Sequence, residues 1–207
     1  MSESLSVRAS VPTIAAINGG LGGGSGNTAA LLEHAARVIG ERARVIAITL
    51  AERPGFARHE AALRGADALL LGTGTYWDSW SSLLQRFLEE ATPSEGTDLW
   101  LGKPAAVLVT AHSVGGKGVL SRLQGVLCTL GCAIPPMSGL VVTLASQAAL
   151  APEHGPGLGP GAGDDLWSPD DLGVVVHNLL ESIAGTRRFE AWPVDRGDPS
   201  RRWLRSP

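Results

Sequence analysis

Cysteine is scarce in this chain, with two residues among 207. Cys128 and Cys132 are too few for the disulfide scaffold of a small secreted domain, and they favour a reducing, cytoplasmic location. Apolar runs of about 18 residues, the length that spans a bilayer, are also lacking. The opening residues, MSESLSVRAS, lack the apolar stretch of a signal peptide. We therefore expect no association with a membrane.

No lysine precedes Lys103 in this chain of 207 residues. The ATP- and GTP-binding loop G-x-x-x-x-G-K-[ST] needs a lysine before its Ser or Thr, so this lack argues against nucleotide hydrolysis. A formal net charge of −3 provides no large basic field. Nucleic acid is therefore not an expected partner.

The remaining composition, with 44% hydrophobic and 18% charged residues, is typical of a globular domain. We place that domain at residues 13–185, after an N-terminal arm over 1–12. A tail rich in Arg and Trp follows over 186–207. Two interpretations of the tail remain open: it clasps a partner subunit or a phosphate of NADPH, or it is poorly ordered.

Glycine, by contrast, is abundant in one stretch, Gly19 to Thr28 (GGLGGGSGNT). The stretch follows the apolar run Thr13 to Ile17 and precedes a helical pattern. In α/β proteins this arrangement presents backbone N–H groups and a helix N-terminus to a phosphate. The dinucleotide pattern G-x-G-x-x-G fits so many glycines in several ways that it is weak evidence. A loop rich in small polar residues and without lysine favours a mononucleotide phosphate, FMN included; a plain glycine-rich turn is the alternative.

Apolar strands alternate with amphipathic helices along the whole domain. Strands are expected over 13–17, 43–50, 68–71, 105–111 and 139–145, and helices over 27–40, 56–65, 81–91, 119–130 and 172–184. Continuous apolar strands separated by helices are typical of a parallel sheet covered on both faces. The sequence therefore predicts an α/β, flavodoxin-like fold, with a five-stranded parallel sheet in the order 2-1-3-4-5 and helices on both faces.

In this topology, ligands bind at the carboxyl ends of strands 1 and 3, where the strand order reverses. That rule selects the loops 18–28, 72–80 and 112–118 as the walls of a site. Tyr76 and Trp77 in the second loop are suited to stacking on a planar ligand, or they only pack against a helix or a second subunit. His112 in the third loop needs no catalytic role.

Three separate motifs then carry a resemblance. GNTAALL, TYWDSWSSLLQRFLE and GKPAAVLVTAHSVGGKGVLSRLQGVLCTLG, in this order and spacing, resemble the NADPH-dependent FMN reductase family over residues 13–145. The chain departs from the family pattern at Leu21 and Gly23, where the family usually has Ser and Arg. Gly74 replaces the usual proline, and Asp78 a glycine. The resemblance implies noncovalently bound FMN, with NADPH or NADH as the reductant.

The resemblance also implies a set of cofactor-binding residues, with no catalytic side chain and no metal. Gly20, Ser25, Gly26, Asn27 and Thr28 fall in the phosphate loop; Thr75, Tyr76, Trp77, Asp78 and Ser79 fall beside the flavin ring; His112, Ser113, Gly115 and Gly116 fall on its other border.

Together these observations predict an oxidoreductase that passes hydride from nicotinamide to FMN, and electrons on to a quinone, a flavin or a similar small acceptor. Members of this superfamily are often dimers, so we expect a homodimer or homotetramer. The alternative is a flavodoxin-like electron carrier, or a non-catalytic scaffold that has lost flavin binding.

Overall fold

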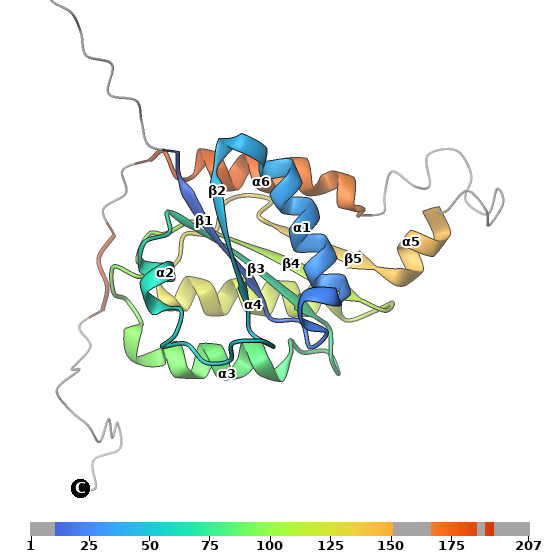
Figure 1. The fold of residues 1–207 in the computed structure, drawn as a ribbon, viewed down its shortest axis with the longest axis horizontal. Helices are drawn as coiled ribbons and strands as arrows, with labels where there is room; N and C mark the ends of the chain where they lie inside the picture. Colours follow the sequence, from blue (N-terminus) through green and yellow to red (C-terminus); the bar gives the residue numbers. More distant parts are fainter. Residues whose placement is uncertain (1–10, 151–166, 186–188, 193–207) are drawn as a thin grey trace, which may run out of the picture.

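A computed structural model describes residues 11–150, 167–185 and 189–192 of the chain. Their strands form one parallel sheet in the order β2-β1-β3-β4-β5, which confirms the predicted topology (Figure 1). The strands are β1 (Thr13–Asn18), β2 (Arg44–Thr49), β3 (Ala68–Gly74), β4 (Ala105–Ala111) and β5 (Gly139–Thr143). The predicted arm, except its last two residues, the segment 152–165 and most of the tail lie outside the described residues.

Helices cover both faces of the sheet, as predicted (Figure 1). One face carries α1 (Asn27–Ile39) and α6 (Leu172–Glu181); the other carries α2 (Glu60–Arg64), α3 (Ser82–Ala91) and α4 (Gly116–Leu130). A further helix, α5 (Leu144–Leu150), follows β5 directly. Single 3₁₀ turns lie at Gly23–Ser25, Gly40–Arg42, Thr92–Ser94 and Pro169–Asp171.

The central strand β3 explains why two hydrophobic cores form. All of its residues are buried. Ala68 and Leu70 face the core beneath α1 and α6, while Leu69 and Leu71 face the core beneath α2, α3 and α4. Successive side chains of a strand point to opposite faces, so an uninterrupted apolar run supplies both cores at once.

Five predicted elements have a boundary that is wrong by two residues or more. The strand expected over 68–71 extends to Gly74, and the helix expected over 172–184 ends at Glu181. The strand expected to end at residue 145 ends at Thr143, because the Thr143 hydroxyl accepts a hydrogen bond from Ser146 N at 3.0 Å and begins α5. Helix α4 begins at Gly116 rather than at residue 119, directly after Gly115 turns the chain with φ +84°. The helix expected over 56–65 spans only Glu60–Arg64.

Within the described ranges, no helix has the length and the apolar run that crossing a bilayer requires.

Candidate cofactor site

The carboxyl ends of β1, β3 and β4 bring the three predicted loops to one edge of the sheet. Backbone hydrogen bonds join them: Gly19 N donates to Gly72 O at 2.8 Å, and Thr75 N donates to Thr110 O at 2.8 Å. The strand register places Asn18 beside Gly72. The loops that follow these strands therefore start at fixed positions relative to one another.

The phosphate loop, residues 19–28, is shaped from beneath by the buried side chain of Asn18. Asn18 Nδ2 donates to Gly23 O at 2.9 Å, and its Oδ1 accepts from Gly20 N at 2.9 Å. Gly23 has φ +56°, a conformation that favours glycine. A Cβ on Gly20 would lie 2.8 Å from Thr28 Oγ1, so a side chain is excluded there as well. Asn18 was not predicted as a site residue; a polar residue ending a buried strand was the signal.

The loop ends at the N-terminus of α1, which has the form of an anion-binding site. Gly26 is the N-cap residue and makes no side-chain capping bond, so among the described residues no side chain accepts from the first N–H groups of the helix. The hydroxyl of Ser25 donates to Gly22 O at 3.3 Å, and Asn27 is exposed at the first helical position. Backbone N–H groups and a helix dipole together attract a phosphate without a Lys or Arg.

Thr28 is buried, and its hydroxyl has a partner within the protein. Thr28 Oγ1 lies 3.0 Å from Thr110 Oγ1, which joins the start of α1 to β4. This contact positions the helix N-terminus against the sheet. Phosphate binding by Thr28 stays a prediction, and it would fall to the backbone N–H group because the hydroxyl has a partner within the protein.

The second loop contains a tight two-residue turn at its tip. Tyr76 N donates to Ser79 O at 2.8 Å, and Ser79 N donates to Tyr76 O at 2.9 Å. Trp77 and Asp78 between them have φ +49° and +57°, the pattern of a type I′ turn. The turn leaves the Trp77 side chain fully exposed.

Tyr76 connects this turn to the phosphate loop. Its hydroxyl oxygen accepts a hydrogen bond from Leu21 N at 3.3 Å. Its ring packs over Gly74, where an added Cβ would lie 2.9 Å from a ring carbon. Glycine in place of the proline typical of the family therefore makes room for the Tyr76 ring.

Ser81 ties the first two loops together from below, and it was not predicted as a site residue. It is fully buried; its hydroxyl donates to Gly19 O and accepts from Leu84 N at 3.1 Å, which caps α3. Its own N–H donates to Thr73 Oγ1 at 3.2 Å. A serine directly before an amphipathic run was the available signal.

The third loop closes the site through the contact of Asp78 with Gly115. A Cβ on Gly115 would lie 2.0 Å from Asp78 Oδ1, so the carboxylate lies against the backbone just before α4. A carboxylate at a helix N-terminus is electrostatically favourable. Arg122 of α4 donates to the Asp78 carbonyl, and its guanidinium lies 5.8 Å from the centre of the Trp80 ring.

The other predicted residues of this loop differ in burial. His112 and Ser113 are exposed, whereas Gly116 is buried. A Cβ on Gly116 would lie 2.4 Å from a methyl carbon of Val141. Gly116 therefore allows α4 to start in close contact with β5.

One atom of the site is left without a hydrogen bond. Thr75 Oγ1 is buried and has no partner among the residues that the structure describes. An unpaired buried hydroxyl typically costs about 1–3 kcal/mol. Its position in the loop predicted to border the flavin fits a ligand with polar atoms at its edge.

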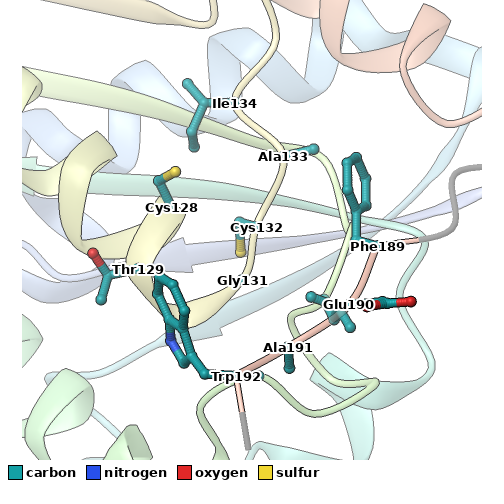
Figure 2. Close-up of a pocket in the computed structure, with 12 residues that line it drawn as sticks. Cys128, Thr129, Gly131, Cys132, Ala133, Ile134, Phe189, Glu190, Ala191 and Trp192 are labelled. Atoms are coloured by element: carbon teal, nitrogen blue, oxygen red, sulfur yellow. The ribbon is translucent and has the colours of Figure 1, made fainter.

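A separate cavity of about 500 Å³ lies at the opposite end of the sheet. Figure 2 shows the rings of Phe189 and Trp192 on either side of Cys132, which precedes β5. Burial raises the pKa of the Cys132 thiol to about 12, so this thiol stays protonated at neutral pH. None of the predicted site residues lines this cavity.

Known protein families provide an independent test of the resemblance. Residues 12–147 match the family model described as NADPH-dependent FMN reductase, which confirms the resemblance of the sequence. No curated protein matches the chain.

Solved structures with a similar fold include several flavoproteins. RosB with bound 8-demethyl-8-formylriboflavin-5'-phosphate is 16% identical with a TM-score of 0.61, covering 95% of this chain and 96% of RosB. An NADH:FMN oxidoreductase (EMOB, apo form) is 18% identical with a TM-score of 0.62, covering 84% and 91%. A flavodoxin from the domain Archaea is 12% identical with a TM-score of 0.57, covering 84% and 99%. At these identities the likeness shows the fold, and it confirms the flavodoxin-like class.

Proposed function

This chain belongs to the NADPH-dependent FMN reductase family, and we propose that it passes electrons from NADPH or NADH through FMN to a small acceptor such as a quinone or a free flavin. Family membership confirms the coarser predictions, an oxidoreductase with FMN as cofactor and NAD(P)H as reductant. When bound, FMN supplies the hydride and electron chemistry, and the protein supplies binding and orientation.

The observation that carries the proposal is the physical connection of the three loops. The uncapped N-terminus of α1 provides the phosphate end of the site. Tyr76, through Leu21 N, and Ser81, through Gly19 O, hold the loop after β3 against the phosphate loop. Asp78 and Arg122 hold that same loop against α4. A phosphorylated planar ligand would contact all three walls.

In this proposal the backbone does most of the binding. The N–H groups of residues 27–29 would face the phosphate, while the Tyr76–Ser79 turn and residues 112–116 would flank the ring. The Thr75 hydroxyl provides a donor for a polar ring atom. The positive end of the α4 dipole would favour negative charge on a bound flavin, although Asp78 would offset part of that effect.

The turn and the third loop also support the proposed homodimer or homotetramer. Trp77 is fully exposed and Val114 is 78% exposed, both beside the site. We propose that these two apolar side chains lie in the interface with a second subunit. Both cysteines are free, which supports the proposed cytoplasmic location.

The test uses the purified full chain, its flavin absorbance and its oxidation of NADPH or NADH. Yellow protein that oxidises either reductant faster when a quinone or free FMN is added supports the proposal. Yellow protein without that oxidation would assign the chain to electron carriers. Colourless protein that takes up no added FMN would assign it to scaffolds.

A further inference from the structure

A second cavity, of about 360 Å³, lies beside the phosphate loop, between α1, the ends of β4 and β5, and α5. Asn27 of the phosphate loop lines it, and so does Thr110, whose hydroxyl meets that of Thr28. From Asn27 the cavity follows α1 as far as Arg37, about 15 Å along the helix axis. In Figure 1, α5 projects from the end of β5 and α1 lies over the sheet.

Apart from Asn27, which borders both, the cavity lies outside the space that the proposed cofactor site assigns to FMN. The phosphate end of that site is at residues 19–28, and its ring end is at the loops after β3 and β4. The residues of β5 and α5 that line the cavity, Val142, Thr143, Leu144 and Gln147, belong to neither loop. A ligand in this cavity would therefore be a second molecule, or the far end of one that reaches the flavin.

The charged lining of the cavity has one sign. His34 and Arg37 lie one turn apart on α1, and none of the lining residues that the structure describes is a carboxylate. Within the described ranges neither side chain makes an ion pair or a hydrogen bond. The nearby Asp171 does not line the cavity; its carboxylate accepts from Ser168 N at 2.7 Å. Among the described residues Arg37 has no partner, so its guanidinium is available to an anionic ligand.

The rest of the lining combines apolar walls with an unpaired amide. Ala30, Leu31, Val142 and Leu144 provide apolar surface. Gln147 also lines the cavity, and its Nε2 atom is buried without a partner among the described residues. A hydrogen-bond acceptor that reached this amide would relieve the cost of leaving it unpaired. Apolar walls with a few convergent polar groups are typical of small-molecule sites.

We propose that this cavity binds the anionic group of one of the two substrates, with Arg37 as its cationic partner and with His34 and Gln147 as hydrogen-bond donors. The anion is a phosphate or a carboxylate on a flat or apolar body. Its source is either the 2′-phosphate end of NADPH or a carboxylate of the electron acceptor. The inference rests on the proposed function for the identity of these substrates, whereas the cavity and its charge do not depend on it.

The first experiment is a calorimetric titration of the full chain, saturated with FMN, with two probes: 2′,5′-ADP and benzoate. We expect one probe to bind and Arg37→Gln to weaken it about tenfold or more, because a charge-assisted hydrogen bond is lost. His34→Gln is expected to weaken it in the same direction. Arg58→Gln is the matched control, because Arg58 is exposed and does not line the cavity. The substitution removes the same charge as Arg37→Gln.

The choice of probe identifies the source of the anion. If 2′,5′-ADP is the probe that binds, we expect Arg37→Gln to raise KM for NADPH and to leave KM for NADH unchanged. If benzoate is the probe that binds, we expect Arg37→Gln to raise KM for a carboxylated quinone and to leave KM for an uncharged quinone unchanged. Failure of both probes to bind, or equal binding by the Arg37→Gln and Arg58→Gln variants, would overturn the proposal. Absence of NAD(P)H oxidation would count against the proposed function instead, since the titrations do not require turnover.

Discussion

The carboxylate of Asp78 lies against the backbone of Gly115, at the point where the chain enters α4. The two residues come from different loops of the candidate site, and their contact fixes the distance between those loops. Gly115 has φ +84° and leaves no space for a Cβ, so its conformation and its contact both require glycine.

Replacing Gly115 by Ala is therefore expected to separate the two loops. The strained conformation should lower the free energy of unfolding by about 1–3 kcal/mol. FMN should bind about tenfold more weakly, as measured by quenching of flavin fluorescence during titration of the apoprotein. Gly118→Ala is the control, because nothing lies near its Cβ and a helical alanine is favourable. Equal FMN affinities of the two variants would show that the Asp78 contact does not shape the site.

Ser81 is predicted to contribute to both stability and cofactor binding. Ser81→Ala removes the cap of α3 and leaves Gly19 O without its hydroxyl donor, so the free energy of unfolding should fall by about 1–3 kcal/mol. The neighbouring Ser82 is exposed, and Ser82→Ala should change the free energy of unfolding by about 0.5 kcal/mol or less. Urea unfolding of both variants measures the difference, and FMN titration should show weaker binding only for Ser81→Ala.

The sequence predicted the strand order because each strand is an uninterrupted apolar run and each connection carries a helix. The sequence predicted the three loops of the site because ligands of this topology bind at the carboxyl ends of strands where the strand order reverses. It did not predict the Asp78–Gly115 contact or the Ser81–Gly19 contact, because both join residues far apart in the chain and no local pattern marks them. Helix α5 was missed because Leu144 and Ala145 continue the apolar run of β5, and only the Thr143 hydroxyl separates the two elements.

Cys132 should make stability depend on pH in the alkaline range. Burial raises the pKa of its thiol from 9.0 to about 12, so above pH 9 the unfolded chain loses a proton that the folded chain keeps. Fewer protons on the unfolded state mean that the free energy of unfolding falls as pH rises, by up to about 1.4 kcal/mol per pH unit.

Lys103 acts in the opposite direction over part of this range, because desolvation lowers the pKa of its ammonium group from 10.5. The Cys132 contribution is therefore obtained as the difference between wild type and Cys132→Ala in urea unfolding at pH 8 and pH 10.5. We expect wild type to lose more stability between these values than the variant. An equal or smaller loss would contradict the burial of the thiol.

The central claim, that the phosphate loop and the N-terminus of α1 hold the phosphate of FMN, is tested most directly by comparing FMN with riboflavin, which lacks that phosphate. Both ligands are titrated into the apoprotein and followed by flavin fluorescence. We predict one FMN bound per chain, about a hundredfold more tightly than riboflavin, since several N–H groups and the helix dipole act on the phosphate. Equal affinities for FMN and riboflavin, or no binding of either, would contradict the claim.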